Sequence, residues 1–150
     1  MKRIRVTKQF TFEMASALPN YDGDCANIHG HSYKLDITVI GEPIEDKSNP
    51  KFGMLIDFGD IKKVVNGEIV DKLDHSMVVS KHSAHGNFDP TKYGFGGKIV
   101  YTDYQPTVEN MLSDFATRLQ GKFPKGVELH SIKIRETGTA FAEWFASDNQ

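Results

Sequence analysis

The chain has 150 residues, a formal net charge of −2 and a single cysteine. That length favours one domain, over residues 1–150, with a substantial hydrophobic core. The near-neutral charge lacks the basic character of nucleic-acid-binding proteins, and no run approaches the ~18 apolar residues of a membrane span. One cysteine cannot form an intrachain disulfide, which fits a reducing compartment. No apolar signal segment follows the N-terminal charges, so we expect a soluble cytoplasmic protein without nucleic-acid or membrane partners.

Alternating apolar residues predict a first strand that starts near residue 4. Its even positions carry the apolar side chains Ile4, Val6, Phe10 and Phe12. Lys8 interrupts the row once, and Met14, Ser16 and Leu18 extend the same face. Residues 19–24 are mostly turn-forming types, so we expect the strand to end before them.

A second strand is predicted from about His29 to Gly41. Its odd positions carry the apolar side chains Tyr33, Leu35, Ile37 and Val39. His29 and His31 share this parity, so they belong to the apolar face if the strand begins that early. Antiparallel pairing with the first strand would place Ser16 near both histidines on the inner face of the sheet.

Two helices are predicted in the middle of the chain. The first covers roughly residues 57–73, and Gly67 weakens it by about 1 kcal/mol relative to alanine. The second follows a good N-cap residue, Thr107, and its apolar residues recur at helical spacing up to Leu119. Residues 80–105 are rich in glycine and show no sustained period, so we expect a long loop, a feature often associated with function.

Two more strands are predicted, over Val127–Glu136 and Ala140–Phe145. The order strand-strand-helix-helix-strand-strand indicates an α+β fold, a four-stranded antiparallel sheet with both helices on one face. Its first and last strands would leave open edges. Pairing these edges with copies of the same chain predicts a cyclic oligomer.

The segment Cys25–His31 contains the only cysteine and, after it, a His-Gly-His sequence. His29 and His31 lie two positions apart, so in an extended segment both side chains point to the same face. Imidazole pairs of this kind bind zinc, copper, iron or nickel. The Cys25 thiol would then serve as a further ligand, or as a nucleophile or base beside the metal. The alternative is a pair of surface histidines with a buried free cysteine.

Other polar residues occupy positions where they are uncommon. Glu136 shares the parity of the apolar residues before it, and buried carboxylates are rare unless they are paired or bind something. The alternative for Glu136 is a simple charge at the end of a strand. The adjacent Asp74 and His75 form either a surface loop or a pair in which the carboxylate orients an imidazole for proton transfer. Glu109 is most simply a favourable charge at the start of a helix.

The motifs fall in a specific order along the chain: Phe10 to Leu18, Cys25 to Tyr33, Gly53 to Phe58, Leu73 to His75, Pro106 to Asn110, and Glu136-Thr137. This set resembles the 6-pyruvoyl-tetrahydropterin synthase / 6-carboxy-tetrahydropterin synthase family over nearly the whole chain. The resemblance implies the tunnelling fold, in which the sheets of three subunits close a barrel and two trimers stack into a homohexamer.

The resemblance also implies a zinc-dependent site. His29 and His31 resemble two of the family's three zinc ligands, and Cys25 resembles the catalytic base. Asp74 and His75 resemble the pair that completes a proton relay. Glu136 resembles the carboxylate that anchors the pterin. Glu109 and Thr107, in the Pro-Thr-x-Glu-Asn motif, are assigned to substrate binding.

The implied substrate is 7,8-dihydroneopterin triphosphate, and the implied reaction is proton abstraction with triphosphate elimination. Loss of acetaldehyde would give the 6-carboxy product, on the branch leading to 7-deazaguanine nucleosides such as queuosine. Two alternatives stay open. One is 6-pyruvoyl-tetrahydropterin synthase activity, and the other is a non-catalytic pterin-binding paralogue.

One position departs from the family pattern. The third zinc ligand of the family is a histidine in the first strand, where this chain has Ser16. A neutral hydroxyl is a poor zinc ligand, and catalytic zinc normally has three protein ligands and an open position. We therefore expect weakened or absent zinc and reduced turnover, unless Ser16 through water or Cys25 itself supplies a further contact.

Overall fold

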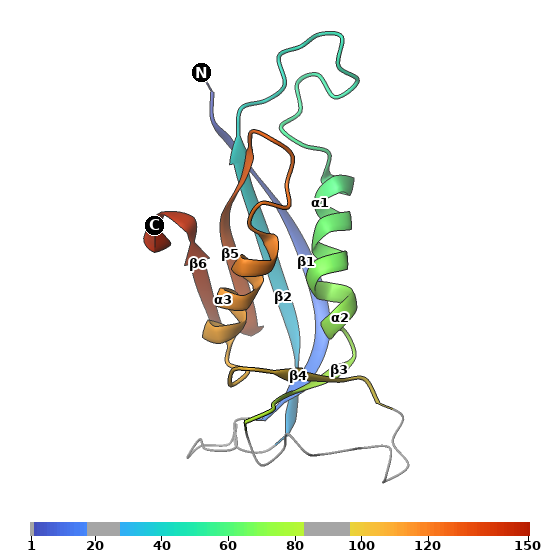
Figure 1. Cartoon of the computed structure of the whole chain (residues 1–150), viewed down its shortest axis with the longest axis vertical. Coiled ribbons are helices and arrows are strands. Elements are labelled where there is room, and N and C mark those ends of the chain that lie inside the picture. Colours follow the sequence, from blue (N-terminus) through green and yellow to red (C-terminus); the bar gives the residue numbers. More distant parts are fainter. Residues whose placement is uncertain (1, 18–27, 83–96) are drawn as a thin grey trace.

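The part of the chain that the structure describes forms one curled sheet with helices on one of its faces (Figure 1). This computed structural model describes residues 2–17, 28–82 and 97–150. The strands are β1 (Ile4–Ser16), β2 (His29–Gly41), β3 (Ser76–Ser80), β4 (Ile99–Thr102), β5 (Val127–Thr137) and β6 (Ala140–Phe145). They lie in the sheet in the order β4-β3-β1-β2-β5-β6.

The four strands predicted from the sequence are present in the structure as β1, β2, β5 and β6. Strands β1 and β2 pair antiparallel along their full length, from Ile4 opposite Gly41 to Ser16 opposite His29. Strand β5 pairs antiparallel with β2 on its other side, and β6 pairs antiparallel with β5. The buried residues of β1 fall on its even positions and those of β2 on its odd positions, so one face of the sheet forms the core.

The predicted four-stranded antiparallel sheet is wrong in two respects. The sheet has six strands among the described residues, and β3 and β4 extend it through parallel pairing, β3 with β1 and β4 with β3. Strand β4 lies within residues 80–105, which showed no sustained period, and β3 comes directly before them and ends at Ser80. Strand β3 is buried at four of its five positions, so it lacks the alternation of a half-buried strand.

Both predicted helices are confirmed. The first consists of α1 (Phe58–Val65), a π-helical turn η2 (Asn66–Val70) and α2 (Asp71–Leu73). The Asp57 carboxylate caps α1 by accepting a hydrogen bond from the Gly59 backbone at 2.7 Å. Gly67, the weak point of the helical pattern, lies in η2. The second helix is α3 (Val108–Leu119), and a short 3₁₀ helix η5 (Ala146–Asn149) follows β6.

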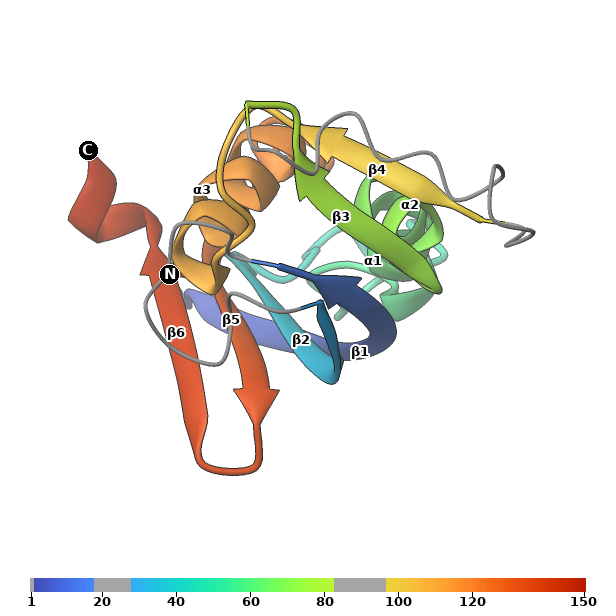
Figure 2. The ribbon, with the colours of Figure 1, turned by 90° about the horizontal axis from the view of Figure 1, so that it is seen from below.

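The core lies between the helices and the inner face of the sheet, the face that the helices cover (Figure 2). Phe12 on β1 stacks on Tyr33 on β2 with ring centroids 5.1 Å apart, and Phe115 on α3 meets Phe12 edge-on at 6.4 Å. Full burial of a large apolar side chain stabilises the fold by about 1.5–3 kcal/mol. No helix in the described residues has the length and apolar character needed to span a membrane.

Candidate functional site

At one end of the sheet, next to the hydrophobic core, the inner face carries polar side chains from three neighbouring strands. On β1 and β2, Met14 lies opposite His31 and Ser16 lies opposite His29. On β5 the same face ends in Glu136. Ser16 is only 3% exposed, so it belongs to the inner face, as predicted from strand parity. The predicted proximity of Ser16 to the histidines is confirmed by its register with His29.

His31 is held by aromatic neighbours on its own strand. Its ring meets Tyr33 edge-on at 5.7 Å and His29 edge-on at 4.8 Å, measured between ring centroids. The Nε2 atom of His31 is buried and makes no hydrogen bond within the described part of the chain. It lies 3.5 Å from Oε1 of Glu136, and the two side chains are 22% and 33% exposed. A buried polar atom without a partner costs about 1–3 kcal/mol, so this nitrogen is arranged for a partner other than the described residues.

His29, His31 and Glu136 present three ligand atoms that all lie within 4.8 Å of one another. Two imidazoles and one carboxylate form a known donor set for catalytic zinc, which leaves a fourth position for water or substrate. Ligand atoms about 2.0–2.2 Å from a tetrahedral zinc are about 3.3–3.6 Å apart. The 3.5 Å between His31 and Glu136 falls in that range, so this pair has the spacing of two metal ligands and the donor set of the three residues suits a metal ion.

Asp74 and His75 form a second polar cluster, beside β1. Oδ1 of Asp74 accepts a hydrogen bond from the Glu13 backbone N–H at 2.9 Å and lies 3.0 Å from Nδ1 of His75. The Glu13 hydrogen bond, together with His75 and Lys98, lowers the pKa of the Asp74 carboxyl below its ordinary 3.8. Lys98 also donates to the backbone carbonyls of Asp71 and Asp74. The carboxylate is thus kept ionised beside the imidazole.

The backbone of His75 adopts an unusual conformation. Its φ of 59° is the only positive value of a non-glycine residue among those described. Its N–H donates to the Glu13 carbonyl at 2.6 Å, which ties this conformation to β1. Left-handed backbone of this kind is uncommon outside glycine and is concentrated at functional sites. The side chain of His75 is 79% exposed, so it is presented to the surroundings.

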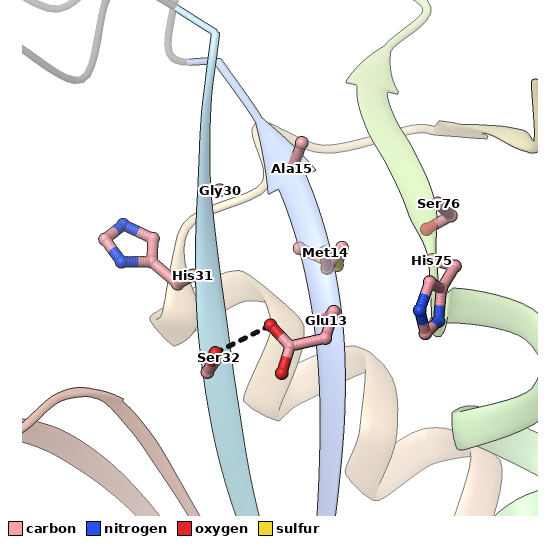
Figure 3. A pocket seen from close by; sticks show the side chains of 8 residues that line it. All are labelled: Glu13, Met14, Ala15, Gly30, His31, Ser32, His75 and Ser76. Atoms are coloured by element: carbon pink, nitrogen blue, oxygen red, sulfur yellow. Dashed lines mark hydrogen bonds between the residues drawn. The ribbon is translucent and has the colours of Figure 1, made fainter.

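The two clusters stay apart within one chain. Figure 3 shows the His31 ring on the side of β2 away from β1, whereas His75 lies beyond β1 at the start of β3. A groove extends over the ends of these strands, lined by Glu13, Met14, Ala15, Gly30, His31, Ser32, His75 and Ser76. The structure therefore brings His29, His31, Glu136 and Ser16 together, and it places Asp74 and His75 across β1 from them.

Sequence reasoning missed two residues of this groove, Glu13 and Ser32. The Ser32 hydroxyl donates to Oε2 of Glu13 at 2.6 Å (Figure 3). Both residues have the outward parity of their strands, and they lie opposite each other in the register. A cross-strand polar pair on the outer face is the signal that would have found them.

The remaining predicted residues are placed as follows. Thr107 caps α3, because its hydroxyl accepts a hydrogen bond from the Asn110 backbone at 3.2 Å. Glu109 is exposed in the first turn of that helix, where the helix dipole favours a carboxylate. The roles assigned to Thr107 and Glu109 in substrate binding stay predictions. Cys25 and Leu18 lie outside the described residues, so the predicted catalytic role of Cys25 also stays a prediction.

Comparison with known proteins places this arrangement in a family. Residues 5–146 match the family model described as 6-pyruvoyl tetrahydropterin synthase. The chain is 31% identical over 141 residues to 6-carboxy-5,6,7,8-tetrahydropterin synthase from Haemophilus influenzae, covering 93% of this chain and 97% of that protein. A protein of the same name from Aquifex aeolicus is 28% identical, with 80% of this chain and 75% of that protein covered.

Solved structures show the same fold. An uncharacterized protein from Wolinella succinogenes superposes with a TM-score of 0.76 at 17% identity, covering 97% of this chain and 99% of that one. The 6-pyruvoyl tetrahydropterin synthase of Caenorhabditis elegans superposes with a TM-score of 0.67 at 21% identity, covering 97% of both chains. Fold and site together define an α+β protein with a histidine- and carboxylate-lined centre at the end of its sheet. The chain belongs to the 6-pyruvoyl tetrahydropterin synthase family and is a lyase of that family.

Proposed function

We propose that this protein converts 7,8-dihydroneopterin triphosphate into 6-carboxy-tetrahydropterin, the reaction on the branch to 7-deazaguanine nucleosides such as queuosine. The observation that carries the proposal is the meeting of His29, His31 and Glu136 at the end of the inner face. Relatives named 6-carboxy-5,6,7,8-tetrahydropterin synthase cover nearly the whole chain, and this supports the carboxy product over the pyruvoyl product.

In this proposal the residues of the inner face bind and orient the substrate. His29 and His31 hold a zinc ion, which when bound polarises the side-chain hydroxyls of the substrate and acidifies the neighbouring C–H bonds. Glu136 lies beside them and accepts hydrogen bonds from the amino-pyrimidine edge of the pterin, a charge-assisted contact. Thr107 and Glu109 contribute to substrate binding from the start of α3.

Proton transfer belongs to Cys25, Asp74 and His75. The Asp74 carboxylate accepts the Nδ1–H of His75, which leaves Nε2 of His75 as the atom that exchanges a proton with the substrate. The Cys25 thiolate acts as the base on the substrate side chain. Asp74 is held in its ionised form by the Glu13 backbone, so it fixes the tautomer of the imidazole throughout the reaction.

The protein acts as a homo-oligomer in this proposal, a trimer or a hexamer of two trimers. Strands β4 and β6 are the outer strands of the sheet, and such edges are available for pairing with another copy. The exposed His75 lies across β1 from the proposed metal ligand His31 of its own chain (Figure 3). A neighbouring copy supplies this imidazole to the site, as expected for a closed, symmetric assembly.

Incubation of the purified protein with 7,8-dihydroneopterin triphosphate tests the reaction. Release of acetaldehyde together with a 6-carboxy pterin supports the proposal, and a pyruvoyl pterin without acetaldehyde contradicts it. Ser16 at the usual position of a zinc-binding histidine favours a second candidate, a non-catalytic pterin-binding paralogue. Pterin binding without turnover, with no activity restored by added zinc, would support that candidate.

A further inference from the structure

We infer that Glu136 is the third protein ligand of the metal site. It takes the place of the family's third histidine ligand, whose position is occupied by Ser16 in this chain. The site in this chain is therefore a two-histidine, one-carboxylate centre formed by His29, His31 and Glu136. The inference rests on the proposed function only in taking the site to bind a metal. It does not depend on which pterin reaction follows.

The order of the strands explains why a carboxylate is able to take this place. Strand β2, which carries both histidines, lies between β1 and β5. A third ligand can therefore approach the histidine pair from either neighbouring strand. On the β1 side the chain has the short, neutral side chain of Ser16, opposite His29. On the β5 side it has the carboxylate of Glu136, on the same inner face.

The distance between Nε2 of His31 and Oε1 of Glu136 matches the distance between two ligand atoms of one metal ion. Their 3.5 Å separation is long for a hydrogen bond, and Nε2 of His31 is buried without a hydrogen-bond partner in the residues described. Two ligands of a tetrahedral zinc are expected about 3.3–3.6 Å apart. A metal between the two atoms would satisfy the buried nitrogen and neutralise the carboxylate together.

Replacing an imidazole with a carboxylate changes the chemistry of the centre. The ligand set gains one negative charge and one hard oxygen donor, and oxygen donors suit metals such as Mn²⁺ more than imidazole does. The carboxylate also has two oxygens. When Oε1 of Glu136 binds the metal, only Oε2 is left to accept a hydrogen bond from the pterin. The carboxylate then anchors the pterin through one oxygen instead of two.

The test is metal binding by the full chain after removal of bound metal with a chelator. Zn²⁺ affinity is measured by competition with a chromophoric chelator for the unmodified protein, Glu136→Gln and Glu128→Gln. Glu128 is an exposed carboxylate on the same strand, outside the site, and is the matched control. We expect at least a tenfold loss of affinity for Glu136→Gln and none for Glu128→Gln. Equal affinities for all three proteins would overturn the inference.

Adding Ser16→His provides an independent check. If positions 16 and 136 serve the same metal, Ser16→His should raise the Zn²⁺ affinity at least tenfold more in the Glu136→Gln background than in the unmodified chain. Equal gains in both backgrounds would contradict a shared role. The absorption spectrum of the Co²⁺-loaded unmodified protein needs no variant. A thiolate-to-metal charge-transfer band would assign the third position to Cys25 and overturn the inference, whereas a spectrum without it supports Glu136.

These measurements separate the inference from the proposed pterin reaction. If Glu136→Gln loses Zn²⁺ while the unmodified protein does not turn over the pterin, the inference stands and the proposed function fails. If the unmodified protein turns over the pterin while Glu136→Gln binds Zn²⁺ as tightly, the proposed function stands and the inference fails.

Discussion

Nε2 of His31 and Oε1 of Glu136 face each other across 3.5 Å at the end of the hydrophobic core. The two residues lie on neighbouring strands, β2 and β5, yet they are more than a hundred positions apart in the sequence. Neither atom completes a hydrogen bond with the other, and the nitrogen is buried. A metal ion bound by both groups would therefore stabilise the folded chain as well as complete the proposed site.

Removing metal is expected to lower the thermal stability of the protein. A metal at a hundred times its dissociation constant adds about 2.7 kcal/mol to the free energy of unfolding, which corresponds to about 5–10 °C for a chain of this size. Scanning calorimetry with and without added Zn²⁺, after chelation, measures the shift. His31→Ala is expected to abolish it. A shift of the same size in His31→Ala would place the metal elsewhere.

Asp74→Asn is expected to lower kcat about 100-fold or more while leaving KM nearly unchanged. The amide can still accept the hydrogen bond from the Glu13 backbone, but it carries no charge to hold the Nδ1–H of His75. Steady-state kinetics with the pterin substrate measure the change. Asp71→Asn, an exposed residue of α2, is the control and should match the unmodified protein. A kcat unaffected by Asp74→Asn would remove the pair from the mechanism.

The same carboxylate is expected to make stability depend on acid pH. The pKa of Asp74 is lowered in the folded protein, so its contribution to stability is fully present above the ordinary pKa of 3.8. This contribution is lost as the pH falls through the lower folded value. The difference in unfolding free energy between the unmodified protein and Asp74→Asn should therefore shrink below about pH 4. Urea titrations at pH 6, 4 and 3 check this, and a difference that grows with acidity would contradict it.

The long strands of the fold were predictable because each has one buried and one solvated face. The alternation in residues 4–16 and 29–41 fixes which side chains enter the core. Strands β3 and β4 were missed for a physical reason. Strand β3 is buried on both faces, β4 has only four residues, and their parallel pairing leaves no hairpin signal in the sequence.

The site was predictable to the extent that strand parity determines it. Parity places His29, His31 and Glu136 on the inner face, and the structure confirms this. Parity does not fix the distance between His31 and Glu136, because the register of β2 against β5 depends on core packing and on an irregularity at Thr38. The positive φ of His75 depends on its hydrogen bond to β1, a contact between segments distant in sequence.

Tyr104→Phe is expected to destabilise the protein by about 1–2 kcal/mol, because it removes a hydrogen bond to a charged group. The Tyr104 hydroxyl donates to Oδ2 of Asp114 at 2.5 Å, and Arg118 donates to Oδ1 of the same carboxylate. Burial, followed by Asp114, raises the pKa of Tyr104 above its ordinary 10.0. The stabilisation is therefore fully present below pH 10 and lost only as the pH rises through the folded value.

Urea unfolding at pH 7 measures the effect of Tyr104→Phe. Asp103→Asn is the control, because Asp103 contacts only exposed partners, Lys81 at 2.7 Å and His82 at 3.9 Å. Exposed ion pairs of this kind contribute about 0–1 kcal/mol. Equal losses for Tyr104→Phe and Asp103→Asn would show that the partly buried Tyr104 hydroxyl contributes no more than the surface contacts of Asp103.

Mixing two inactive variants is expected to restore activity if neighbouring copies share the site. His31→Ala removes a proposed metal ligand, and His75→Ala removes the imidazole that lies beyond β1 from it. Each variant alone should be inactive. In an assembly formed at random from equal amounts of both, about a quarter of the sites would combine an intact His31 from one copy with an intact His75 from another.

The measurement is turnover by the two variants after co-expression, compared with each variant expressed alone. Recovery to about a quarter of the unmodified rate supports a site assembled between copies. If both residues act within one chain, every site in the mixture carries one of the two substitutions, and no activity should return. Size-exclusion chromatography of both variants is the control, because a change in oligomeric state would by itself prevent recovery. Activity that stays at the level of the single variants, in assemblies of unchanged size, would contradict the shared site.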